Sequence, residues 1–146
     1  LQAALGLHQL PRVDAYHARR EQIWSAYDAA FADLPAGRRI GLPAPQEPDT
    51  LHARHLYSVM VDEETSGITR DGFLMAMTRQ GIGVGVHYLS LPEHPYYQQR
   101  LGWRPEDFPH AARLGRATVS LPISARLTDG DVGDVVLAVR RCLGVE

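Results

Sequence analysis

The sequence contains no lysine, so all 15 of its basic residues are arginines. A Schiff base with a carbonyl compound needs a lysine amine, which excludes that chemistry from this chain. The formal net charge is −2, and no basic cluster exceeds the pairs Arg19-Arg20 and Arg140-Arg141. Domains that bind nucleic acid carry a strong basic patch, and the lack of one predicts that nucleic acid is not a partner.

Cysteine and long apolar runs are equally scarce. A single cysteine, Cys142, excludes an internal disulfide and fits a reducing compartment. It falls on the apolar side of a predicted terminal helix, where we expect a buried thiol. No apolar run approaches the roughly 20 residues that span a bilayer, and no signal-peptide pattern opens the chain. These features predict a cytoplasmic protein with no membrane partner.

The chain also lacks an initiator methionine, and its first residues, "LQAALGLHQL", already follow a helical period. We therefore expect it to be part of a longer protein, with this apolar helix packed against more protein than the chain supplies. The 146 residues are 45% hydrophobic and 22% charged, which is typical of one folded globular domain.

Periodicity predicts helix over residues 1–34, with a kink or a fresh start near Leu10 because Pro11 interrupts it. Residues 34–50 carry four of the ten prolines and predict a loop, with a short edge strand at 39–42. Strands are predicted at 55–62, 84–88 and 118–123, and helices at 70–80, 109–116 and 129–143, with a short helical segment within 92–101. The predicted fold is an α/β unit of α+β character: a long N-terminal helix, then a small sheet of about three strands with helices packed against it.

Two of these helices carry capping signals. Thr69 is suited to cap the helix at 70–80, and Gly81 stands where a C-terminal glycine belongs. Thr128 and Asp131 form a Thr-x-x-Asp capping signature for the last helix.

The most distinctive segment is "GIGVGVHYLSLPEHPYY", residues 81–97. Its glycines follow a helix and lead into a strand, the reverse of the order that a phosphate-binding loop needs. Gly83 and Gly85 instead favour close backbone packing or close approach of a ligand. His87 and Tyr88 follow at the predicted strand end, which favours a pocket wall with at most one of the two side chains facing the pocket. A satisfied strand-end hydrogen bond is the alternative interpretation.

The sequence gives little support for a metal site or for a catalytic serine. His52 and His55 enter a predicted strand, where a spacing of three sends their side chains to opposite faces, and no cysteine pair supports a zinc site. No G-x-S-x-G elbow surrounds Ser90 or Ser120. We therefore predict neither a metal site nor a Ser-His-Asp hydrolase.

Four segments together resemble a known family: "LQAALGLHQL…DAYHARREQIWSAYDAAF", "HARHLYSVMVD", "RDGFLMAMTRQGIGVGVHYLSLPEHPYYQQRLGW" and "FPHAARLGRATVSLPISARLTDGDVGDVVLAVRR". In this order they are similar to the C-terminal part of DegT/DnrJ/StrS nucleotide-sugar aminotransferases. The resemblance implies the small domain of the aspartate-aminotransferase fold type. Residues 1–34 would be the helix leading from a large domain that this chain lacks, and residues 35–146 would be the small domain.

The resemblance also implies a function. Such enzymes use pyridoxal 5'-phosphate (PLP), are usually homodimers, and pass an amino group, typically from glutamate, to a nucleotide-linked keto-sugar. The catalytic lysine would lie upstream of Leu1, so this chain alone is expected to be inactive and to contain no catalytic residue, with PLP bound mainly by the large domain. His87 and Tyr88 match the family's substrate-binding His-Tyr pair, while Pro92 stands where the family often has a second histidine.

Two alternatives belong to other functional classes. The chain could be a stand-alone, non-catalytic ligand-binding module derived from such an enzyme, or a structural or dimerisation fragment. Binding of a nucleotide sugar would separate these two alternatives.

Overall fold

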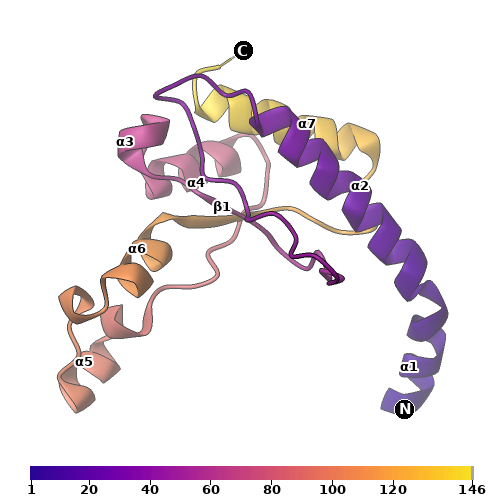
Figure 1. Ribbon diagram of the computed structural model, residues 1–146, viewed down its shortest axis with the longest axis horizontal. Coiled ribbons are helices and arrows are strands. Elements are labelled where there is room, and N and C mark those ends of the chain that lie inside the picture. Colours follow the sequence, from indigo (N-terminus) through magenta and orange to yellow (C-terminus); the bar gives the residue numbers. More distant parts are fainter. Residues whose placement is uncertain (146) are drawn as a thin grey trace.

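The computed structural model describes residues 1–145 as a compact centre with two helical legs (Figure 1). The legs descend on opposite sides in this view. One is formed by the N-terminal helices, and the other by the segment that contains α5 (Pro95–Leu101) and α6 (Pro109–Ala117). We call the side of the sheet that lies between the two legs in this view the open side.

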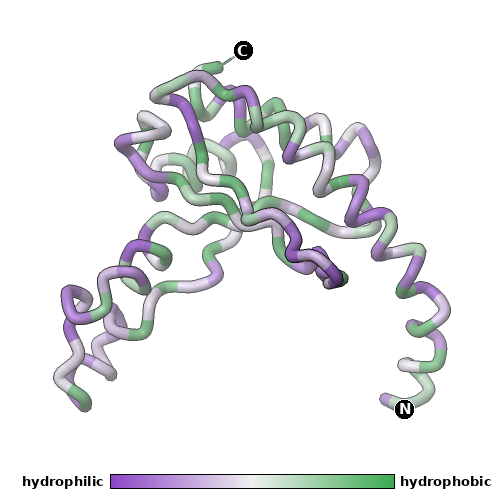
Figure 2. Tube along the Cα trace, in the orientation of Figure 1, coloured by the Kyte–Doolittle hydropathy of each residue, from purple (hydrophilic) through white to green (hydrophobic). Residues whose placement is uncertain are grey.

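The N-terminal helix is long, as predicted, but it is divided at Pro11. Helix α1 (Gln2–Gln9) is followed by the 3₁₀ turn η1 (Leu10–Arg12) and by α2 (Val13–Phe31), which confirms the predicted interruption. Helix α1 has no buried residue. Helix α2 buries only side chains of its C-terminal half, namely Ile23, Trp24, Tyr27 and Phe31. The first leg therefore projects from the core, and Figure 2 shows apolar positions along it.

The sheet is smaller than predicted. Strands β1 (Tyr57–Met60) and β2 (Thr118–Leu121) pair antiparallel, with Tyr57 opposite Leu121 and Ser58 opposite Ser120. In residues 1–145 these are its only two strands, so the prediction of about three strands was wrong.

The backbone of the predicted strand at 84–88 pairs with β2 at a single isolated bridge, between Gly85 and Ser120. Gly83 and Gly85 have no side chains for the cross-strand contacts that stabilise a ladder, which explains why pairing stops after one residue. The predicted edge strand at 39–42 is likewise reduced to a bridge between Gly41 and Met60.

The other predicted helices are present, and a short one was missed. Helix α3 (Glu63–Ser66) occupies a segment between the predicted strand at 55–62 and the predicted helix at 70–80. The remaining elements are α4 (Arg70–Arg79), η2 (Leu91–Glu93), η3 (Pro105–Asp107) and α7 (Asp129–Cys142). Thr69 caps α4 by accepting a hydrogen bond from the Gly72 amide, and the capping box of Thr128 and Asp131 begins α7, as predicted.

One face of the sheet forms the core with α2, α4 and α7. Tyr57, Val59 and Val119 are fully buried there, together with Phe73 of α4 and Val139 of α7. Because side chains alternate along a strand, Ser58 and Ser120 point to the opposite face, toward the open side. The fold thus gives the sheet one apolar face and one polar face.

Cys142 lies half-buried against the core, where burial raises the pKa of its thiol. Among the described residues, no helix is both long enough and apolar enough to cross a bilayer.

Two helical glycines give a matched test of this packing. A Cβ added to Gly115 of α6 would lie 2.6 Å from the backbone nitrogen of Ser90, whereas a Cβ on Gly133 of α7 would meet nothing within 4 Å. We expect Gly115→Ala to lower the free energy of unfolding by about 1–3 kcal/mol through overpacking. Gly133→Ala should raise it by up to about 1 kcal/mol through helix propensity. Urea denaturation of both variants checks this; changes of the same sign would contradict it.

Candidate functional site

His87 lies on the polar face of the sheet. Its Nδ1 is 2.9 Å from Ser120 Oγ, and Ser120 Oγ is 3.0 Å from Ser58 Oγ. Ser120 is only 4% exposed, while His87 and Ser58 are half-buried. The imidazole therefore makes the strand-end hydrogen bond that was the alternative interpretation. Its Nε2 makes no hydrogen bond to residues 1–145, which leaves that nitrogen available for a ligand.

Tyr88 is 76% exposed and meets the His87 ring edge to face, with centroids 4.9 Å apart and planes at 86°. The peptide bond between the two residues is cis. Residues 84–88 do not form a strand, so strand alternation does not apply to this pair. That at most one of the two side chains faces a pocket stays a prediction. The structure brings the two predicted binding residues together as one small polar and aromatic surface.

The segment after Tyr88 is tied to α6 by an ionic network. Glu93 accepts hydrogen bonds of 2.6 Å from Ser90 Oγ and from Arg116 Nε. Burial opposes ionisation of Glu93, but these hydrogen bonds and the charge of Arg116 outweigh it and hold the Glu93 pKa below its ordinary value of 4.5. Pro92, at the position of the family's second histidine, is buried.

Aromatic side chains pack against one another along the second leg. Tyr97 stacks on Trp103 with ring centroids 5.6 Å apart, and Trp103 contacts Phe108 at 5.2 Å. Tyr96 is 67% exposed and meets Tyr97 edge to face. The sequence motif at residues 81–97 does not indicate this cluster, because Trp103 and Phe108 lie beyond it.

A basic hollow of about 440 Å³ lies between the first leg and the end of the sheet. We define it by Arg12 and Arg20 of the leg, His55 before β1 and Arg126 after β2. Tyr16 and Ser124 add hydroxyl groups, and no acidic side chain is among its described lining residues. No local sequence pattern indicates this hollow, because its residues come from three segments that only the fold brings together.

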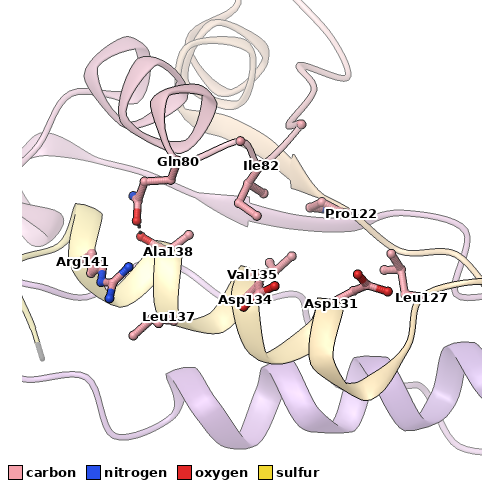
Figure 3. A pocket seen from close by; sticks show the side chains of 12 residues that line it. Gln80, Ile82, Pro122, Leu127, Asp131, Asp134, Val135, Leu137, Ala138 and Arg141 are labelled. Atoms are coloured by element: carbon pink, nitrogen blue, oxygen red, sulfur yellow. Dashed lines mark hydrogen bonds between the residues drawn. The ribbon is translucent and has the colours of Figure 1, made fainter.

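A second hollow, of about 520 Å³, lies between α7 and residues 80–83 (Figure 3). Two of its polar side chains have structural roles. Asp131 belongs to the capping box of α7, and Gln80 Nε2 donates hydrogen bonds to the Ala138 carbonyl and to Cys142 Sγ. His87 and Tyr88 are not among the residues that line it. We therefore place the candidate site at His87, Tyr88 and the basic hollow.

The residues present do not provide a covalent site for PLP, because the chain has no lysine. No group of three or more His, Cys, Asp or Glu side chains within residues 1–145 is arranged to hold a metal ion. His52 Nδ1 accepts a hydrogen bond from the Arg54 amide, a local structural role.

Comparison with known proteins gives one consistent result. Residues 1–140 match the model of the DegT/DnrJ/EryC1/StrS aminotransferase family. The spore coat polysaccharide biosynthesis protein SpsC of Bacillus subtilis is 44% identical over 142 residues, which are 96% of this chain and 35% of SpsC.

Solved structures agree with this match. Spr1654 of Streptococcus pneumoniae in its PMP form superposes with a TM-score of 0.84 at 28% identity, over 97% of this chain and 34% of that one. DesV of S. venezuelae, solved with a ketimine intermediate, gives a TM-score of 0.81 at 30% identity, over 97% of this chain and 36% of that one. The chain thus spans about a third of the length of the proteins that it matches.

The Glu93 network predicts a pH-dependent contribution to stability. A carboxyl whose pKa is lowered on folding stabilises the fold above its unfolded pKa, and this contribution is lost as the pH falls through the folded pKa. We expect Glu93→Gln to cost about 1 kcal/mol at pH 7. The difference from the parent should shrink below pH 4.5. Urea denaturation across this range, with the exposed Glu106→Gln as control, measures it. A pH-independent difference would refute the assignment.

Proposed function

This chain belongs to the DegT/DnrJ/EryC1/StrS aminotransferase family, and from that membership we propose that it is the small C-terminal domain of a PLP-dependent sugar aminotransferase. Residues 1–34 form the helix that enters this domain, and residues 35–146 form the domain itself. The proposal is supported by similarity along nearly the whole chain to proteins about three times as long.

Pyridoxal phosphate is the cofactor of this family, and Spr1654 has been solved in both PLP and PMP forms. When bound, it supplies the electron sink that amino-group transfer requires. In our proposal the lysine that carries it lies outside these 146 residues, and this chain alone is inactive. The contribution of this domain is to bind and orient the substrate.

The observation that carries the proposal for the site is the placement of His87 and Tyr88. Ser120 holds one imidazole nitrogen, while His87 Nε2 and the hydroxyl of the exposed Tyr88 make no hydrogen bond to the described residues. Groups fixed in this way orient a sugar without a large loss of side-chain freedom on binding. We propose that both residues contact the keto-sugar.

The basic hollow supports a nucleotide-linked form of that sugar. Ser120, which holds His87, and Ile123, which lines the hollow, are three residues apart. That separation corresponds to roughly 10 Å of extended chain. A substrate that carries a diphosphate beside its sugar could contact both surfaces, with Arg12 and Arg126 facing the negative charge.

The remaining parts of the proposal follow the family. Glutamate is the amino donor, the complete protein is a cytoplasmic homodimer, and the amino sugar enters polysaccharide biosynthesis, the role named for SpsC. A stand-alone module without catalysis is the competing function, because the chain lacks lysine.

Activity of the full-length protein tests the function. With PLP, glutamate and a panel of nucleotide-linked keto-sugars, we expect glutamate to be converted to 2-oxoglutarate as the sugar is aminated. His87→Ala and Tyr88→Ala should raise KM for the sugar about tenfold and leave PLP content unchanged, since neither residue holds the cofactor. Binding of a nucleotide sugar without turnover would favour the non-catalytic module. Neither binding nor turnover would favour a structural or dimerisation role.

The basic hollow makes a separate prediction. Arg12→Ala and Arg126→Ala should each raise KM about fivefold at low salt, and the effect should shrink as ionic strength rises, because exposed charges are screened. Arg79→Ala serves as the control, since Arg79 is exposed on α4 and does not line the hollow. If all three variants changed KM to the same extent, the basic hollow would not belong to the substrate site.

A further inference from the structure

We propose that Gly85, Ser120 and Ser58 form a seat for the His87 imidazole, which fixes the ring orientation and its tautomer so that Nε2–H meets the substrate. We call these three residues the imidazole seat. The inference rests on the proposed function to the extent that His87 contacts a sugar. The seat residues are positioning residues, because they act on the substrate only through His87.

The hydroxyl groups of the seat form a short chain across the sheet. Ser58 lies directly opposite Ser120 in the register of β1 and β2, and their Oγ atoms are 3.0 Å apart. Ser120 Oγ is in turn 2.9 Å from His87 Nδ1. Since Ser120 is almost fully buried, its hydroxyl is held by these two neighbours.

The hydrogen bonds between Ser58, Ser120 and His87 can run in either of two directions. If Ser58 donates to Ser120 and Ser120 donates to Nδ1, both hydroxyl protons are used, and Nδ1 is an acceptor. In the reverse direction Nδ1–H donates to Ser120 and Ser120 donates to Ser58, whose own proton then has no acceptor among residues 1–145. The first arrangement leaves Nε2–H, in place of the Ser58 proton, without an acceptor among residues 1–145. A substrate oxygen bound at Nε2 supplies that acceptor, so the first arrangement fits the proposed role of His87, with the proton of the neutral imidazole on Nε2. A donor at Nε2 suits a carbonyl, hydroxyl or phosphate oxygen of a substrate.

Gly85 supplies the space for the ring. A Cβ added to Gly85 would lie 2.7 Å from His87 Cε1, 3.4 Å from Nδ1 and 3.5 Å from Nε2. The imidazole thus lies against the bare Cα, and any side chain at this position must displace it. Gly85 is not among the glycines with positive φ, so its role is steric rather than conformational. Because the displaced group is a side chain, the substitution should move the ring at little cost to the fold.

The neighbouring glycine offers a matched control. A Cβ on Gly83 would meet nothing within 4 Å, and Gly83 also lacks a positive φ. Gly83→Ala therefore changes the same segment in the same chemical way but leaves the seat intact. Any effect shared by Gly83→Ala and Gly85→Ala would reflect loss of backbone freedom, whereas an effect of Gly85→Ala alone reports on the ring.

The test uses the full-length protein with ¹⁵N-labelled histidine, at a pH where imidazoles are neutral. NMR chemical shifts distinguish the two tautomers, and His87→Gln identifies the His87 signals by their loss. We expect the Nε2–H form in the parent and in Gly83→Ala, and a mixture of tautomers in Ser120→Ala and Gly85→Ala. Ser58→Ala, at a half-buried position, should also shift the ratio, because it removes the donor that fixes the direction of the chain.

Kinetics supply the second measurement. Ser120→Ala and Gly85→Ala should raise KM for the nucleotide-linked keto-sugar about fivefold through a ring that is no longer fixed, with a smaller change in kcat. An Nδ1–H form in the parent would overturn the proposal, as would variants of the seat that match Gly83→Ala in both tautomer and KM. The NMR measurement needs no turnover. The Nε2–H form in a protein without aminotransferase activity would therefore support the seat and refute the proposed function.

Discussion

The antiparallel pairing of β1 with β2 is the contact on which the rest of this structure depends. Its register places Tyr57 opposite Leu121 on the core face and Ser58 opposite Ser120 on the other. The same four-residue ladder therefore anchors the hydrophobic core and supplies the hydroxyl groups that hold His87. If one strand slipped by one residue in this register, its core-facing and polar side chains would exchange faces, because strand side chains alternate. Both the core packing and the support of His87 would be lost. The stability of this domain and the geometry of its candidate site therefore both depend on the register of β1 and β2.

The core side of that ladder is fastened to α2 by two tyrosines. Tyr57 donates a hydrogen bond of 2.6 Å to the Asp28 carboxylate, and Tyr27 donates one of 2.8 Å to the carbonyl of Pro122. Burial raises the pKa of both phenols, for Tyr57 with the added effect of the Asp28 carboxylate, so both remain neutral donors. Since Pro122 directly follows β2, these contacts fix α2 against the strand end that borders the basic hollow. The geometry of the hollow is thus set by buried contacts on the core side.

The sequence predicted what depends on near neighbours in the chain. The helices, the Thr69 cap and the capping box at Thr128 arise from contacts within a few residues, and all were confirmed. The third strand, predicted at 84–88, was not confirmed. Alternating hydrophobicity predicts a strand but does not show that Gly83 and Gly85 leave too few side chains for a ladder. His87 and Tyr88 could be selected as candidates from their place after a strand-like segment. The partner of His87, Ser120, lies 33 residues away, and no local pattern relates the two.

The two legs place apolar surface on either side of this polar centre. Leu5 and Leu10 of the first leg are 64% and 70% exposed, and Leu91 and Tyr96 of the second are 51% and 67% exposed. Exposed apolar surface of this kind is typical of a face that contacts more protein. In the proposed complete enzyme, covering the legs would also exclude water from the open side between them. Lower local polarity strengthens hydrogen bonds and charge contacts, so a donor at His87 Nε2 would bind substrate more strongly there than in the exposed domain. The position of the polar face between two apolar legs thus relates domain assembly to substrate binding.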